Sequence, residues 1–169
     1  MRRSIVIQAS ARSEGDSSLI AQYAADTLGC PPIDLLSFNF SGYDYQSQNK
    51  EDDFLPLMRS LVKYDCLIFV TPVYWYSMSG LLKNFFDRIT DCLKIEKETG
   101  RQLRGMQMAA MSCSNTEDGI DGFFTPFRLS AEYLGMGYLG DLHCWVASGE
   151  IPAEVGSLLD EFLMKIKSD

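Results

Sequence analysis

Two patterns of apolar residues run along the chain and predict strands that alternate with helices. Unbroken apolar runs are typical of strands buried on both faces, and weaker apolar runs are interpreted as further strands. Together they predict five strands, at residues 4–9, 33–38, 65–71, 105–113 and 136–147. Apolar residues spaced by three and four predict amphipathic helices. The clearest helix covers residues 78–93, and others are predicted at residues 19–28, from about 52 to 62, and 155–166.

The remaining segments are polar or mixed. Residues 39–50 are predicted to form a long loop, and residues 94–104 a charged connection that faces solvent. Residues 115–134 are expected to be helical, with a fresh helix start at Thr125-Pro126, because Thr is favoured as a cap and Pro in a first turn. Four polar residues of the helix at 78–93 are expected to face away from the core: Lys83, Asn84, Asp87 and Arg88.

Strands that alternate with helices form right-handed crossover units, which give a parallel sheet. The pattern therefore predicts a doubly wound α/β sandwich. In such folds the ligand site lies at the carboxyl ends of the strands, where the strand order switches. The loops expected at those ends are residues 10–18, 71–78 and 112–119.

Composition narrows the possible functions. A chain of 169 residues fits one domain, so residues 1–169 are interpreted as a single domain. The net charge of −8 argues against binding to nucleic acid and to anionic membranes, which attract cationic surfaces. Five cysteines without a CxxC pair argue against a disulfide framework and a zinc site. We therefore expect reduced thiols, no metal, and a cytoplasmic location.

The first of the three loops has the composition of a phosphate site. It contains Ser10, Arg12, Ser17 and Ser18 just before a predicted helix, whose free N–H groups and partial positive charge favour an anion. The alternative interpretation is ordinary helix capping by Asp16 or Ser17. Neither GxxxxGK[ST] nor GxGxxG occurs, so the loop has no signature of a nucleotide triphosphatase or of a Rossmann dinucleotide site.

The second loop and the helix after it read TPVYWYSMSGLLKNFFDR, residues 71–88. This segment resembles the signature of the flavodoxin-like NAD(P)H-dependent FMN reductases, a group that includes quinone reductases. The segment ASARSEGDSSLIA, residues 9–21, resembles the phosphate loop of the same family, usually written GS-x-R-x-x-G-N-[ST]. The resemblance covers nearly the whole chain. It implies a flavodoxin-like three-layer sandwich with strand order 2-1-3-4-5, FMN as cofactor, NAD(P)H as co-substrate and a homodimer.

The resemblance also assigns roles to individual residues. It implies that Ser10, Arg12, Ser17 and Ser18 hold the FMN phosphate. Along the isoalloxazine ring it places Pro72, Val73, Tyr74 and Trp75, with main-chain N–H groups near O4 and N5. On the ribityl or pyrimidine side it places Ser112, Cys113 and Ser114. No side chain is assigned as a catalytic acid or base, because the flavin carries out the hydride chemistry.

This chain departs from the family pattern at two places. Asp16 stands where the pattern has Asn, and a carboxylate beside a phosphate is unfavourable unless it turns away to cap its helix. The iron–sulfur flavoproteins of this family carry a four-cysteine motif after the second strand, whereas residues 40–50 of this chain, FSGYDYQSQNK, contain no cysteine. Because a cluster needs thiolate ligands, none is expected at that position.

Several aromatic and polar residues have two interpretations. Tyr43 and Tyr45 either cover the flavin or lie on the surface, and Trp75 either contacts a ligand or serves packing. Cys113 is interpreted as a buried, inert thiol, and His143, the only histidine, as structural.

The function expected from the resemblance is an oxidoreductase that passes hydride from NAD(P)H through flavin N5 to a small acceptor. A quinone, a free flavin, or an azo or nitro aromatic would serve as that acceptor. The alternatives are a flavodoxin-type electron carrier without substrate turnover and a flavin-free regulatory or scaffold protein on the same fold.

Overall fold

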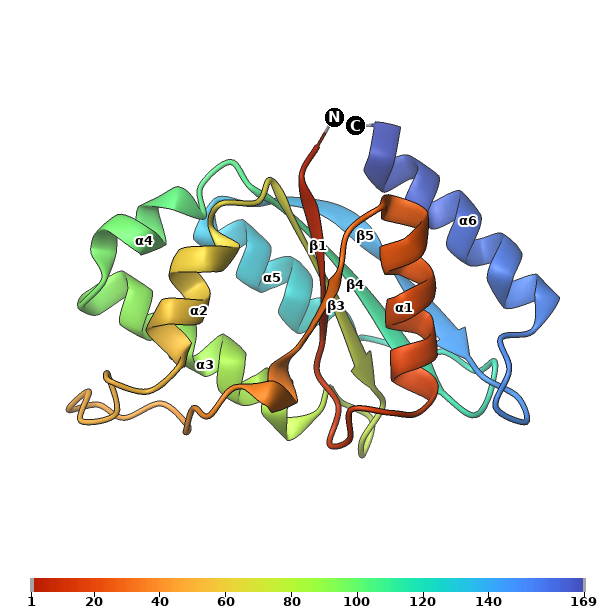
Figure 1. The fold of residues 1–169 in the computed structure, drawn as a ribbon, viewed down its shortest axis with the longest axis horizontal. Coiled ribbons are helices and arrows are strands. Elements are labelled where there is room, and N and C mark those ends of the chain that lie inside the picture. Colours follow the sequence, from red (N-terminus) through yellow and green to blue (C-terminus); the bar gives the residue numbers. More distant parts are fainter. Residues whose placement is uncertain (1, 169) are drawn as a thin grey trace.

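The computed structural model describes residues 2–168 as a three-layer α/β sandwich (Figure 1). All strand pairs are parallel, in the order β2-β1-β3-β4-β5, which confirms the predicted architecture. The strands are β1 (Ser4–Gln8), β2 (Pro32–Asp34), β3 (Cys66–Pro72), β4 (Gln107–Ser114) and β5 (Gly137–Trp145). The helices are α1 (Asp16–Leu28), α2 (Phe54–Leu61), α3 (Gly80–Lys94), α4 (Lys97–Gln102), α5 (Thr125–Leu134) and α6 (Ala153–Ser168).

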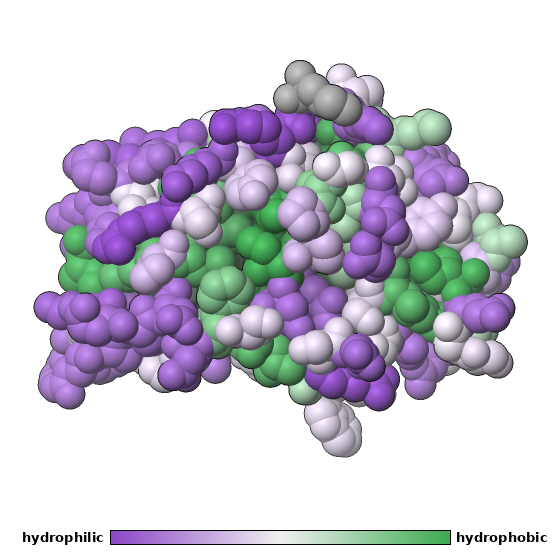
Figure 2. Space-filling model, viewed as in Figure 1, coloured by the Kyte–Doolittle hydropathy of each residue, from purple (hydrophilic) through white to green (hydrophobic). Residues whose placement is uncertain are grey.

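Two cores of different composition lie on the two faces of the sheet. Helices α1 and α6 cover one face, at the right of Figure 1, and pack mainly aliphatic residues against it. Helices α2 to α5 lie on the other face, where Phe54, Phe69, Phe85 and Phe127 form a chain of aromatic contacts with centroid distances of 5.5–6.4 Å. Figure 2 shows that hydrophilic residues cover most of the visible surface and that hydrophobic residues form separate patches. Among residues 2–168, no helix combines the length and apolarity that a bilayer crossing needs.

Three local predictions are wrong. Residues 33–38 were expected to be a strand, but β2 ends at Asp34, whose side chain accepts from Leu36 N at 3.0 Å and starts a 3₁₀ turn over Leu35–Ser37. The charged connection expected at residues 94–104 contains α4, which packs on α3 so closely that a Cβ on Gly100 would meet Cys92 O at 2.2 Å. Residues 115–124 are not the expected helix, whereas the predicted fresh start at Thr125-Pro126 is confirmed, with Thr125 as the first helical residue rather than the cap.

Arg88 also departs from expectation, because its side chain is fully buried rather than on the solvent side of α3. The loop of residues 39–53 covers the Arg88 side chain. The Arg88 guanidinium donates to Asp52 Oδ2 at 2.6 Å, to Asp91 Oδ2 at 2.8 Å and to Ser41 O at 3.0 Å, and it lies 4.8 Å from the centre of the Phe54 ring. The buried charge is therefore paired on several sides, as buried charges require.

Candidate functional site

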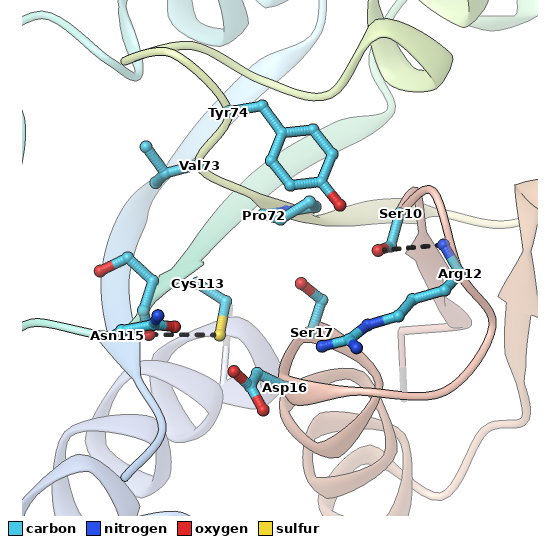
Figure 3. A pocket seen from close by; sticks show the side chains of 10 residues that line it. Ser10, Arg12, Asp16, Ser17, Pro72, Val73, Tyr74, Cys113 and Asn115 are labelled. Carbon is cyan, nitrogen blue, oxygen red and sulfur yellow. Dashed lines mark hydrogen bonds between the residues drawn. The ribbon is translucent and has the colours of Figure 1, made fainter. Parts of the chain in front are cut away.

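A cavity of about 310 Å³ opens at the carboxyl edge of the sheet, between the loops that follow β1, β3 and β4. This is the edge at which doubly wound folds place ligands. The volume lies at the lower end of the range for small-molecule pockets. Its lining residues are Ser10, Arg12, Asp16, Ser17, Pro72, Val73, Tyr74, Cys113, Ser114 and Asn115 (Figure 3).

One end of the cavity has the donors that an anion needs. Figure 3 shows Ser10, Arg12 and Ser17 at this end, with the Ser17 hydroxyl directed into the cavity. Gly15 precedes α1 with φ = 143°, and a Cβ there would meet Arg12 Nε at 2.5 Å, so the glycine makes room for the Arg12 side chain to fold over it. Within residues 2–168 no partner is recorded for the backbone N–H groups of Asp16 and Ser17, as is usual for a first helical turn.

The start of α1 is stabilised by Ser18 rather than by Asp16 or Ser17. Ser18 Oγ accepts from Gly15 N at 2.9 Å and donates to Gly15 O at 2.6 Å. The capping interpretation of Asp16 and Ser17 is therefore wrong. Their side chains line the cavity instead, while the Ser18 hydroxyl is engaged away from it.

A buried serine fixes the first two loops relative to each other. Ser79 Oγ donates to Ala9 O at 2.7 Å and accepts from Leu82 N at 3.1 Å, so it joins the end of β1 to the N-terminus of α3. Ser79 N donates to Thr71 Oγ1 at 3.0 Å, which adds the end of β3 to the same network. Sequence reasoning did not identify Ser79 or Thr71 as site residues. The Ser at the N-cap position before α3 was the available signal.

The loop after β3 forms a two-residue hairpin that projects at the bottom of Figure 1. Tyr74 and Ser77 exchange backbone hydrogen bonds of 2.9 and 3.1 Å, which leaves Trp75 and Tyr76 at the tip with φ of 49° and 63°. Such turns favour Asn and Gly, and bulky residues there are strained by about 1–3 kcal/mol each. Trp75 is 93% exposed and does not line the cavity.

The main-chain donors of this hairpin are only partly available to a ligand. Val73 N donates to Cys113 O at 2.9 Å, and Tyr74 N donates to Ser77 O. No partner is recorded within residues 2–168 for the N–H groups of Trp75 and Tyr76. Any ligand atom that accepts from this hairpin would therefore meet those two groups.

The far wall of the cavity comes from the end of β4. Cys113, Ser114 and Asn115 line it, whereas Ser112 is 1% exposed and does not. The side chains of Ser112 and Ser114 share the face of the strand opposite Cys113, where both hydroxyls lie at His143, and Ser114 reaches the cavity because it is the last residue of β4. Burial, and secondarily the charge of Asp16, raise the pKa of the Cys113 thiol to about 12. The thiol therefore stays protonated at neutral pH, in line with the prediction that it is inert.

His143 holds the loop behind this wall. Its Nε2 lies 3.0 Å from Thr116 O, and a carbonyl only accepts, so Nε2 carries the proton. Its Nδ1 then accepts from Ser112 Oγ at 2.7 Å. His143 is thus hydrogen-bonded on both ring nitrogens and is absent from the cavity lining, which agrees with its structural interpretation.

Of the eleven residues that the resemblance assigns to FMN, the structure brings eight to one cavity: Ser10, Arg12, Ser17, Pro72, Val73, Tyr74, Cys113 and Ser114. Ser18, Trp75 and Ser112 lie outside the lining.

Tyr43 and Tyr45 do not line the cavity either. Lys94 Nζ, at the end of α3 away from the cavity, donates to the Tyr43 hydroxyl at 2.7 Å, and the ring of Tyr45 packs against Tyr43. Among residues 2–168, no group of His, Cys, Asp and Glu side chains is arranged to hold a metal ion.

Residues 3–150 match the family model of NADPH-dependent FMN reductases. The chain is 24% identical, over 80% of each sequence, to YwqN of Bacillus subtilis (strain 168), provisionally named an NAD(P)H-dependent FMN-containing oxidoreductase. The fold is similar to that of a Trp repressor binding protein from Bacillus subtilis, with a TM-score of 0.76, 23% identity and coverage of 95% of this chain and 97% of that one. It is also similar to an NADPH-quinone reductase from P. pentosaceus, with a TM-score of 0.71, 16% identity and coverage of 96% of each chain. The family match includes all three loops that line the cavity.

Proposed function

Because the chain belongs to the NADPH-dependent FMN reductase family, and is therefore an oxidoreductase that uses FMN and NAD(P)H, we propose that the cavity at the carboxyl edge of the sheet is its FMN site. We propose further that residues 1–169 act as a single FMN-binding domain that reduces a small acceptor. The acceptor classes are a quinone, a free flavin, or an azo or nitro aromatic. One observation carries the proposal: the polar loop before α1 and the aromatic hairpin after β3 line the same cavity.

The donor set of the cavity fits a phosphate monoester. Ser10, Arg12 and Ser17 supply two hydroxyls and a guanidinium, and the start of α1 adds free N–H groups with a partial positive charge. The space kept open at Gly15 places the guanidinium where it faces the cavity. In our proposal these groups hold the phosphate and fix the orientation of the cofactor.

The opposite end of the cavity fits a flat aromatic ring. Pro72 stiffens the exit of β3, and Tyr74 presents its ring above the cavity in Figure 3. Trp75 and Tyr76, whose N–H groups have no partner within residues 2–168, follow the lining residue Tyr74 in the hairpin. In our proposal these donors stabilise negative charge on the pyrimidine portion of a reduced flavin. Bound FMN supplies the redox chemistry, accepting hydride from the nicotinamide and passing electrons to the acceptor.

The direct experiment is cofactor reconstitution followed by turnover. We expect the purified protein to bind FMN and, once loaded, to oxidise NAD(P)H in the presence of a quinone. The apoprotein without flavin is the control and should leave NAD(P)H intact. A folded protein that ignores added FMN would refute the proposal.

A flavodoxin-type electron carrier is the second candidate, and the net charge of −8 favours it, because acidic surfaces suit docking to cationic redox partners. Stopped-flow reduction separates the two. An NAD(P)H-dependent reductase is reduced rapidly by the pyridine nucleotide, whereas a carrier is reduced slowly by it.

We also propose a cytoplasmic homo-oligomer. Exposed apolar side chains of α3 and α5, among them Leu93, Leu129 and Tyr133, support self-association. Sedimentation velocity at several concentrations measures the oligomeric state, and a monomer throughout would contradict this part of the proposal.

A further inference from the structure

Asp16 is the only acidic residue that lines the cavity among residues 2–168. It is the first residue of α1, and Figure 3 shows its carboxylate between the Cys113 sulfur and the Arg12 guanidinium. No hydrogen bond or ion pair of the carboxylate is recorded within those residues, although the Arg12 guanidinium lines the same cavity. The helix start does not use the carboxylate either, because Ser18 provides that contact.

The charges that line the cavity therefore cancel. Arg12 is its only cationic side chain and Asp16 its only anionic one among the described residues. A phosphate monoester carries between one and two negative charges at neutral pH. The attraction of Arg12 and of the helix N-terminus for such a group is opposed by the carboxylate of Asp16, the first residue of the same helix, which lines the same cavity. Asp16 already influences the cavity, since its charge contributes to the raised pKa of the Cys113 thiol after the larger effect of burial.

We propose that Asp16 weakens binding of the phosphate of FMN, so that the protein holds FMN as an exchangeable ligand and discriminates only weakly between FMN and riboflavin. This inference rests on the proposed function, because it requires the cavity to be the flavin site. Asp16 is then an affinity-setting residue rather than a catalytic one. Its effect depends on the phosphate and disappears for a flavin that lacks it.

The variant Asp16→Asn tests the inference with little change of shape. Asn is the residue that the similar family pattern has at this position, and it keeps the size of the side chain while removing the charge. We expect it to lower the dissociation constant for FMN on the order of tenfold to a hundredfold. This is the size of the repulsion between two charges that solvent screens in part. Riboflavin binding should change by less than about threefold, because only the phosphate interacts with the removed charge.

Glu14→Gln is the matched control. Glu14 belongs to the same loop, is exposed, does not line the cavity, and its substitution changes the net charge by the same amount. Screening by salt should keep its effect on FMN below about threefold. The measurement is the dissociation constant of the apoprotein for FMN and for riboflavin, from quenching of flavin fluorescence, for the wild type and both variants.

Each outcome has a distinct meaning. Tighter FMN binding in Asp16→Asn alone, with riboflavin unchanged, supports the inference. Equal FMN affinity in Asp16→Asn and Glu14→Gln overturns it. Weaker binding of both flavins in Asp16→Asn also overturns it, because that result means the carboxylate accepts hydrogen bonds from the ribityl chain. If all three folded proteins bind neither flavin, the proposed function itself fails, together with the inference.

Discussion

Replacing Arg88 by Ala should destabilise the protein far more than any comparable change of a surface charge. The Arg88 side chain is completely buried and, among residues 2–168, is the only hydrogen-bond partner of the Asp91 carboxylate, which belongs to a residue that is itself 1% exposed. It also donates twice to Asp52 at 2.6 and 3.0 Å. Arg88→Ala therefore leaves two carboxylates without their cation and opens space beneath the loop of residues 39–53.

The expected cost follows from this burial. Removing one partner of a buried ion pair typically costs about 3–5 kcal/mol, because the remaining charge is left unpaired away from water. Domains of this kind are stable by only about 5–15 kcal/mol, so the loss is a large fraction of the total. With a slope near 2 kcal/mol per molar urea, the unfolding midpoint should fall by about 2 M.

The pH dependence gives a second signature. Burial alone would raise the pKa of Asp52, but hydrogen bonds from Arg88 and from backbone N–H groups lower it overall, below the ordinary value of 3.8. A carboxyl whose pKa is lowered by folding stabilises the fold above its unfolded pKa, and this stabilisation is lost as the pH falls through the folded pKa. The gap in stability between wild type and Arg88→Ala should therefore narrow below about pH 3.8.

Urea unfolding followed by far-UV circular dichroism measures these differences. Lys83→Ala is the control on the same helix, since the Lys83–Asp87 pair is exposed and worth only about 0.3–0.5 kcal/mol. FMN binding by Arg88→Ala at low urea should match the wild type, because Arg88 does not line the cavity. Equal destabilisation by Arg88→Ala and Lys83→Ala would refute this reasoning.

Three further substitutions address the site, and a fourth, Gly29→Ala, is a control away from it. Arg12→Ala should weaken FMN binding by about 10- to 150-fold, the equivalent of one charge-assisted hydrogen bond, and an unchanged dissociation constant would remove Arg12 from the site. Gly15→Ala should weaken FMN binding, because the new methyl group meets Arg12 Nε at 2.5 Å. Gly29→Ala is the control: a Cβ there meets nothing within 4 Å, and only the φ of 70° is unfavourable. This control should lower the free energy of unfolding by about 1 kcal/mol and leave FMN binding unchanged. Tyr76→Gly should raise the free energy of unfolding by up to about 1 kcal/mol through relief of the left-handed backbone. A loss of stability would mean that the turn is not strained.

The buried parts of the fold could be predicted from the sequence because burial leaves a periodic pattern. Strand β3 and helix α3 show this pattern clearly, and both were predicted to within two residues. Helix α4 is only six residues long, and its buried residues, Thr99 and Gly100, form no apolar stripe. Arg88 was assigned to the solvent side because its position on α3 is polar, and only the distant Asp52 explains its burial.

The candidate site could be predicted as a set of loops but not in its details. The rule that ligands bind at the carboxyl ends of parallel strands identified all three loops that line the cavity. It does not determine which side chains of a loop face inward. Ser18 and Asp16 are both suited to a helix start, and the hydrogen bonds of Ser18 with Gly15 decide that Asp16 faces the cavity.

A crystal structure of the protein with FMN would test the central claim most directly. We predict the phosphate oxygens within hydrogen-bonding distance of Ser10, Arg12 and Ser17, and the ring against Tyr74. Flavin density in the groove of about 320 Å³ between α3 and α5, lined by Phe86 and Leu129, with the cavity at the carboxyl edge left empty, would contradict the account.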